Sequence, residues 1–106
     1  MRHVPPPARS RLAALARVTV RRRVIVSGRV QGVFFRDECR RTAHVERLTG
    51  WVMNRPDGRV EACFEGEADA VARLVAWCRQ GPTGAHVTGI EVLEEEPRGG
   101  AGFVIR

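Results

Sequence analysis

Apolar and polar residues follow a strand-like or a helical period over most of the chain, and the first two such stretches lie at residues 18–27 and 35–46. The first, VTVRRRVIVS, is β-branched and partly alternating, which predicts a strand. The second places apolar or small side chains at i, i+4, i+7 and i+8 from Phe35, which predicts a helix. Glu46 falls on the apolar face of this helix, a local mismatch.

A turn signal separates the next two stretches. Residues 50–55 and 59–65 are both β-capable, and the P-D-G between them predicts a hairpin, because Pro presets φ and Gly tolerates positive φ. In the second of these strands Val60, Ala62 and Phe64 alternate with mostly charged residues, so one face is apolar.

The second half of the chain predicts one more helix and two more strands. Residues 67–80 carry the strongest helical pattern, with acids in the first turn and Gly81-Pro82 as the stop. Residues 85–93 and 103–106 then predict strands. The order is β-α-β-β-α-β with a short extra C-terminal strand. We therefore predict an α+β protein with the split βαβ pattern, in which two helices cover one face of an antiparallel sheet.

The positive charge of the chain is concentrated at its N-terminus. The 106 residues carry a formal net charge of +6, but residues 1–23 hold seven arginines and no acid, so the remainder is nearly neutral. The net charge therefore does not indicate a nucleic-acid or membrane partner for the folded part. We predict one domain at residues 20–106 after a basic extension at residues 1–19, expected to be disordered. A transit peptide and a nucleic-acid or membrane contact are weaker alternatives for that extension.

Cysteine and histidine spacing argues against metal and disulfide proteins. Cys39, Cys63 and Cys78 are odd in number and show no C-x-x-C spacing, so we expect buried, reduced thiols. The three histidines are isolated along the chain, and we predict no metal site and no cofactor. No apolar run reaches the roughly 20 residues that a membrane span needs, and no secretory signal follows the basic start. We expect a soluble, cytoplasmic protein.

The stretch SGRVQGVFFR, residues 27–36, joins the first strand to the first helix and has no capping residue after Ser27. A glycine-bearing loop before a helix exposes N–H groups and the positive end of the helix dipole, which favour a bound anion. Arg36 adds a planar set of donors that can hold two phosphate oxygens. The alternative is an ordinary glycine turn beside a solvated arginine, since the spacing fits neither a P-loop nor a dinucleotide-binding fingerprint.

Asn54 is the second candidate for a functional residue. An asparagine just before a P-D-G turn usually serves the turn. Its amide nevertheless carries both an acceptor and donors, so it could hold a water and contact a phosphate oxygen if its strand lies near the loop.

Taken together, these motifs resemble the acylphosphatase family. The resemblance rests on GRVQGVFFR at residues 28–36 and on GWVMN at 50–54 with the P-D-G that follows. It continues through FEG at 64–66, the helix that contains Trp77, Gly81-Pro82 and FVIR at 103–106, and covers about residues 20–106. It implies a ferredoxin-like sandwich and a metal-independent acylphosphatase, an enzyme that hydrolyses acyl phosphates such as acetyl phosphate to a carboxylate and inorganic phosphate.

The resemblance also implies which residues act on the substrate. Arg36 and Asn54 would be the catalytic residues: Arg36 binds the phosphoryl group, and Asn54 orients the attacking water. The phosphate would be held by Arg36 and by the loop from residue 28 to residue 34. That loop comprises Gly28, Arg29, Val30, Gln31, Gly32, Val33 and Phe34.

One point sets this chain apart from the family pattern. Family members usually carry an apolar residue and then a glycine near the end of the first helix, where this chain has Glu46 and Arg47. We therefore expect that end of the helix to fray, or the chain to leave it differently.

A non-catalytic domain that binds acyl phosphates or anions on the same fold is the alternative function. An RNA-binding module is disfavoured, because the third strand offers only Phe64 for base stacking. We expect a monomer that takes a small acyl phosphate and no nucleic acid.

Overall fold

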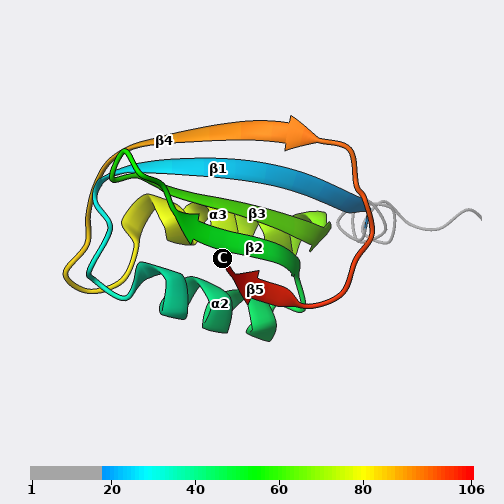
Figure 1. The fold of residues 1–106 in the computed structure, drawn as a ribbon. Coiled ribbons are helices and arrows are strands. Elements are labelled where there is room, and N and C mark those ends of the chain that lie inside the picture. The colour runs from blue at the N-terminus through cyan, green and yellow to red at the C-terminus, as the bar shows by residue number, and fades with distance from the viewer. Residues whose placement is uncertain (1–17) are drawn as a thin grey trace, which may run out of the picture.

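The computed structural model describes residues 18–106, which form a five-stranded sheet with two helices on one face (Figure 1). The predicted element order is confirmed. The predicted extension lies outside the described residues as far as residue 17, and Thr19 already begins the first strand. No helix within residues 18–106 has the length and apolarity to span a bilayer. The elements are β1 (Thr19–Arg29), α2 (Phe35–Val45), β2 (Thr49–Asn54), β3 (Val60–Glu67), α3 (Ala68–Gln80), β4 (His86–Glu95) and β5 (Phe103–Ile105).

The sheet is mixed rather than purely antiparallel as predicted. Four strands pair antiparallel in the order β4-β1-β3-β2, and β5 pairs with β2 in parallel. The direction of β5 follows from the path of the chain. Because β4 and β2 run in opposite directions, a chain that turns back after β4 and crosses to the far edge meets β2 in the parallel sense (Figure 1).

The hydrophobic core fills the layer between the sheet and the two helices. The strands alternate as predicted, so every second residue points toward the helices. Phe64 of β3 stacks on Phe103 of β5 with ring centroids 5.6 Å apart, which joins the core to the last strand. The cysteines are free and buried, as predicted. The largest fully buried side chains are Val24, Val26, Val30, Phe35, Cys39, Val52, Val60, Cys63, Phe64, Val71, Leu74 and Cys78.

The sequence predicts that the end of α2 frays or that the chain exits it differently; the helix does not fray, and the chain leaves it through Arg47 in place of a glycine. Arg47 takes the left-handed conformation (φ 58°) that glycine usually supplies at this position. The N–H of Leu48 donates to the carbonyl of Ala43 at 2.9 Å, and the N–H of Arg47 donates to that of His44 at 3.1 Å. This is the Schellman pattern, with Leu48 buried beneath it. Glu46, the residue that did not fit the apolar face of the helix, forms an ion pair with Arg73 of α3.

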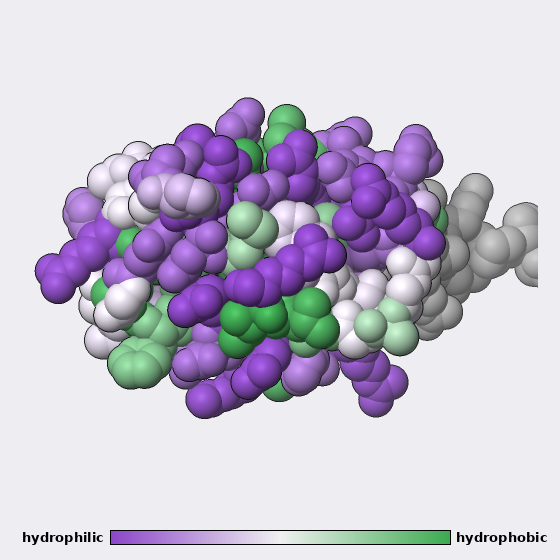
Figure 2. Space-filling model, in the orientation of Figure 1, coloured by the Kyte–Doolittle hydropathy of each residue, from purple (hydrophilic) through white to green (hydrophobic). Residues whose placement is uncertain are grey.

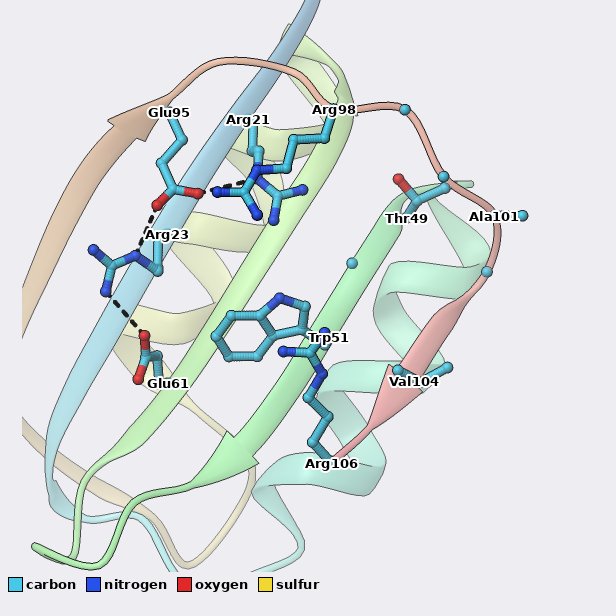
Figure 3. A pocket seen from close by; sticks show the side chains of 14 residues that line it. Arg21, Arg23, Thr49, Trp51, Glu61, Glu95, Arg98, Ala101, Val104 and Arg106 are labelled. Carbon is cyan, nitrogen blue, oxygen red and sulfur yellow. Dashed lines mark hydrogen bonds and ion pairs between the residues drawn. The ribbon is translucent and has the colours of Figure 1, made fainter.

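The helix-free face of the sheet carries a ladder of ion pairs (Figure 3). Arg21 of β1 bonds Glu95 at 3.0 Å and Glu65 at 3.3 Å, since both carboxylates stand opposite it on the neighbouring strands. Glu65 is 5% exposed and also accepts the N–H groups of Arg98 and Gly99 at 2.7 and 2.8 Å. Glu65 therefore fastens the β4–β5 connection over the sheet. Figure 2 shows this face as mainly hydrophilic, with a small apolar patch over β5.

The environment of Glu65 makes stability depend on pH. Burial alone would raise the pKa of this carboxyl, but the N–H groups of Arg98 and Gly99 and the guanidinium of Arg21 outweigh it and lower the pKa below its ordinary 4.5. A carboxyl whose pKa is lowered on folding stabilises the fold above its unfolded pKa, and that contribution is lost as the pH falls through the folded pKa.

We predict that Glu65→Gln lowers the free energy of unfolding at pH 7 by about 2 kcal/mol, because buried donors lose a charged acceptor. Urea unfolding from pH 7 to pH 3 measures it, and the gap from the unsubstituted protein should narrow below about pH 4.5. Glu94→Gln is the control: that side chain is 82% exposed, and its pairing with Arg22 is worth less than about 0.5 kcal/mol. A gap that stays constant over this range would contradict the role of the Glu65 charge.

Candidate active site

Three connections meet at one end of the molecule: the β1–α2 loop, the β2–β3 hairpin and the α3–β4 turn (Figure 1). Gln31 joins the first two. Its side-chain amide nitrogen donates to the carbonyls of Arg55 at 2.8 Å and Arg59 at 3.0 Å, the two residues that flank the hairpin turn. One side chain therefore fixes the loop against the strand end that carries Asn54.

Close packing with β4 explains the first glycine of the loop. A Cβ on Gly28 would lie 2.1 Å from the carbonyl oxygen of His86, and φ here is +119°. The β1–β4 register shifts between Ser27 and Gly28, so the strand bends where it leaves the sheet. Gly28 and Arg29 still pair with β4, and the free loop begins at Val30.

The N-terminus of α2 has no side-chain cap. Phe34 occupies the N-cap position in the left-handed conformation (φ 64°), and among residues 18–106 no side chain caps the first turn with a hydrogen bond. The N–H of Glu38 donates to the carbonyl of Phe34 at 3.1 Å and closes the first turn. The N–H groups of Phe35, Arg36 and Asp37 precede it and point out of the helix end, where an anion is favoured.

A pocket of about 340 Å³ lies at this helix end. Asn54 of β2 lines it together with Arg36 of α2, so the structure brings the two predicted catalytic residues to one cavity from separate elements. Within residues 18–106 Arg36 makes no ion pair, and the Asn54 amide makes no side-chain hydrogen bond, so both groups are available to a ligand. The lining residues are Val30, Gly32, Phe34, Phe35, Arg36, Asp37 and Asn54.

The structure divides the predicted phosphate-binding loop into two kinds of residue. Those at 30, 32 and 34 line the pocket, whereas Gly28, Arg29, Gln31 and Val33 lie outside its lining. Of these four, Gly28 and Gln31 shape the loop through β4 and the hairpin. Sequence reasoning missed this use of Gln31, for which a glutamine in a loop gives no signal. It also did not place Asp37 in the site, although an acid three residues into a helix is a visible feature of the sequence.

Charged side chains in the hairpin turn after Asn54 pair with one another. The guanidinium of Arg59 donates to Asp57 at 2.7 Å, and the Arg59 backbone N–H donates to the same carboxylate at 3.0 Å. The Arg59 side chain and then its backbone N–H hold the pKa of this carboxyl well below its usual range. The N–H of Gly58 donates to the carbonyl of Arg55 at 3.1 Å and closes the predicted P-D-G turn.

A larger pocket, of about 560 Å³, lies on the helix-free face and contains none of the predicted site residues (Figure 3). Four arginines line it. Arg21 and Arg23 are paired with Glu61, Glu65 and Glu95, and the guanidinium of Arg106 lies 4.6 Å from the Trp51 ring, whereas the Arg98 side chain forms no ion pair within residues 18–106. Within residues 18–106 no three His, Cys, Asp or Glu side chains gather in a way that could hold a metal ion. The smaller pocket at the N-terminus of α2 is therefore the candidate active site.

Comparison with known proteins identifies the family of the chain. The family model described as acylphosphatase matches residues 22–105. The chain belongs to the acylphosphatase family. An acylphosphatase from Rubrobacter xylanophilus is 62% identical over 92 residues, which cover 86% of this chain and 84% of that protein.

Solved acylphosphatase structures share the fold. The acylphosphatase from Coxiella burnetii superposes with a TM-score of 0.80 at 39% identity, over 83% of this chain and 93% of that one. The crystal structure of the acylphosphatase from Bacillus subtilis gives 0.79 at 41% identity, over 82% and 98%. These relatives support an enzyme that hydrolyses acyl phosphates, on the ferredoxin-like α+β fold.

The contacts of Gln31 generate a prediction for this site. Gln31→Ala removes two hydrogen bonds that hold the loop to the hairpin, so the distance between Asn54 and the N-terminus of α2 becomes less well fixed. We expect acyl phosphate turnover to fall about tenfold or more, because small displacements of positioned groups are costly to catalysis. Steady-state kinetics with acetyl phosphate measure this.

Gln80→Ala is the matched control, since that amide is exposed at the end of α3. If Gln31→Ala and Gln80→Ala kept the same turnover, the bridge to the hairpin would have no role in catalysis.

Proposed function

We propose that this protein hydrolyses acyl phosphates without a metal ion, with the phosphoryl group bound at the N-terminus of α2 and by Arg36, and with the attacking water held by Asn54. One observation carries the proposal: a single pocket is lined by Arg36, by the uncapped first turn of α2 and by Asn54 from a different strand. The physiological acyl phosphate would be a small molecule that enters this pocket.

The chemistry of an acyl phosphate suits such a site. Its leaving group is a carboxylate, a weak base, so no strong general acid is needed to expel it. Phosphoryl transfer then depends on positioning and on stabilising charge that spreads over the equatorial oxygens. Backbone N–H groups and a guanidinium supply those donors from fixed positions, which avoids reorganisation as the charge develops.

The proton of the attacking water goes to a substrate oxygen or to solvent in this mechanism. The Arg36 guanidinium stays protonated in proteins and the Asn54 amide is not basic, so neither accepts it. The Asn54 side-chain oxygen can accept a hydrogen bond from the water. This hydrogen bond orients a lone pair of the water oxygen toward phosphorus. Asp37 lines the pocket in the first turn of α2, and its carboxylate is a rival for the same N–H groups rather than a ligand for a phosphoryl group.

Arg36→Gln should lower kcat/KM for acetyl phosphate by about a thousandfold in excess chelator and weaken competitive inhibition by inorganic phosphate, because a charged donor to the phosphoryl group is lost. Arg36→Lys should recover only part of this, since an ammonium lacks the planar pair of donors. Arg40→Gln is the control, one helical turn further along and exposed, outside the pocket lining. Phosphate binding without any turnover in the unsubstituted protein would instead favour the non-catalytic anion-binding domain.

Asn54→Ala should lower kcat about a hundredfold or more, while the inhibition constant of inorganic phosphate changes less than threefold, because the amide acts on the water. Asp37→Asn tests the rival assignment of a general base. We expect that variant to bind phosphate as tightly as the unsubstituted protein or more tightly, with an unchanged pH profile of kcat. Normal turnover in Asn54→Ala would refute water positioning, and loss of the acidic limb of the pH profile in Asp37→Asn would assign the proton to Asp37.

A further inference from the structure

A second depression, of about 390 Å³, lies directly beside the phosphate pocket. Phe34 lines both cavities, so the two adjoin at this residue. The remaining walls come from the β1–α2 loop, α2, α3 and the α3–β4 turn. The lining residues are Val33, Phe34, Glu38, Trp77, Pro82 and Thr83.

Phe34 is an unusual residue for its position. Its side chain is 75% exposed, whereas the neighbouring Phe35 is 2% exposed. It also adopts φ 64°, a conformation that is costly for a bulky residue and is concentrated at functional sites. A large apolar ring exposed to solvent at the edge of a ligand pocket lowers the free energy of binding when it packs on an apolar part of a ligand, because both surfaces leave water.

The second depression has a fixed shape because the core supports it. Trp77 packs edge to face against Phe35 with ring centroids 5.0 Å apart. Gly81 lets the α3–β4 turn approach, since a Cβ there would lie 3.0 Å from the Phe35 ring. The N–H of Ala85 donates to the carbonyl of Pro82 at 3.0 Å and closes that turn beside Phe34.

The direction of the reaction places the acyl group. In phosphoryl transfer the attacking and leaving oxygens lie roughly in line on opposite sides of phosphorus. Asn54, which holds the water in the proposed function, lines only the phosphate pocket. The leaving carboxylate therefore points away from Asn54, and the second depression adjoins the phosphate pocket at Phe34, on a side that Asn54 does not line.

We propose that this second depression is the acyl subsite and that it selects flat or apolar acyl groups over acyl groups that carry a second negative charge. The inference rests on the proposed function. Val33, Trp77 and Pro82 offer apolar surface to the acyl group. Glu38 is the one charged residue that lines the subsite among residues 18–106. Its carboxylate pairs with Arg41 at 3.3 Å, but that arginine is largely exposed and lies outside the lining, so the charge that faces the subsite is negative and disfavours a second anion.

The charge of Glu38 is tested by comparing acetyl, benzoyl and succinyl phosphate. Glu38→Gln should raise kcat/KM for succinyl phosphate about three- to tenfold, as expected for one nearby like charge near a surface, and leave acetyl phosphate within twofold. Glu96→Gln is the matched control, an exposed acid outside this lining. An unchanged ratio of succinyl to acetyl phosphate in Glu38→Gln would overturn the selection by charge.

The volume of the subsite is tested by filling it. Thr83→Trp places a large side chain in the depression from its exposed rim and should lower the ratio of kcat/KM for benzoyl phosphate to that for acetyl phosphate about tenfold. Thr19→Trp, at the start of β1, controls for the added surface tryptophan. An equal loss for both substrates, or no loss, would contradict an acyl subsite here.

A binding measurement keeps this inference separate from the proposed function. The chain has two tryptophans, so Trp51→Phe leaves Trp77 as the reporter in the subsite. Benzoylphosphonate, which cannot be hydrolysed at phosphorus like its phosphate counterpart, should change Trp77 fluorescence, whereas acetylphosphonate should not. Absence of any acyl phosphate turnover would refute the proposed function, while this titration still decides on the subsite. Normal acetyl phosphate turnover without a Trp77 response to benzoylphosphonate would overturn the subsite alone.

Discussion

Among residues 18–106, no side chain caps the backbone N–H groups at the first turn of α2. The fold fixes the position of these groups because one residue before this turn and one at its start are buried. Val30 is fully buried before the loop turns outward, and Phe35 is buried as the helix begins. These two buried residues constrain the short segment between them. Within it, Phe34 adopts a left-handed conformation, and its ring is exposed. N–H groups at an open helix end are bound by water in the free protein, and an anion at that end can take the place of this water.

Fixing one helix end does not by itself make a catalytic site, because the water must come from a defined side. In the proposed function Asn54 supplies that side from β2, and its distance from the loop depends on the β2–β3 hairpin. Asp57 and Arg59 pair across the hairpin turn, and Gln31 joins the hairpin to the loop through two hydrogen bonds. Catalytic geometry at one end of the sheet thus depends on three side chains that never need to touch the substrate.

The sequence predicts the elements and the two catalytic candidates for different reasons. Alternation and helical spacing reveal which residues face the core, so the order of elements follows from local pattern. Arg36 and Asn54 emerge from a whole string that resembles a family. The two hydrogen bonds of Gln31 span 24 and 28 residues, and no local pattern encodes them. The left-handed Arg47 and the parallel β5 are likewise consequences of tertiary packing, which overrides the usual preference for glycine and the simple antiparallel expectation.

Arginines show most clearly what the folded chain adds to the sequence. Every fixed cation in this protein is an arginine, so charge alone cannot separate a structural one from a functional one. Arg21 and Arg23 stand opposite carboxylates in the sheet and stabilise it, and Arg59 closes the hairpin turn. Arg36 has no carboxylate partner within residues 18–106 and lies at a helix N-terminus, where a second positive group raises the local potential. Asp37 is the one carboxylate in the lining of this pocket among residues 18–106, and it forms no ion pair with Arg36, so the guanidinium is open to a ligand that brings negative charge, as a phosphoryl group does.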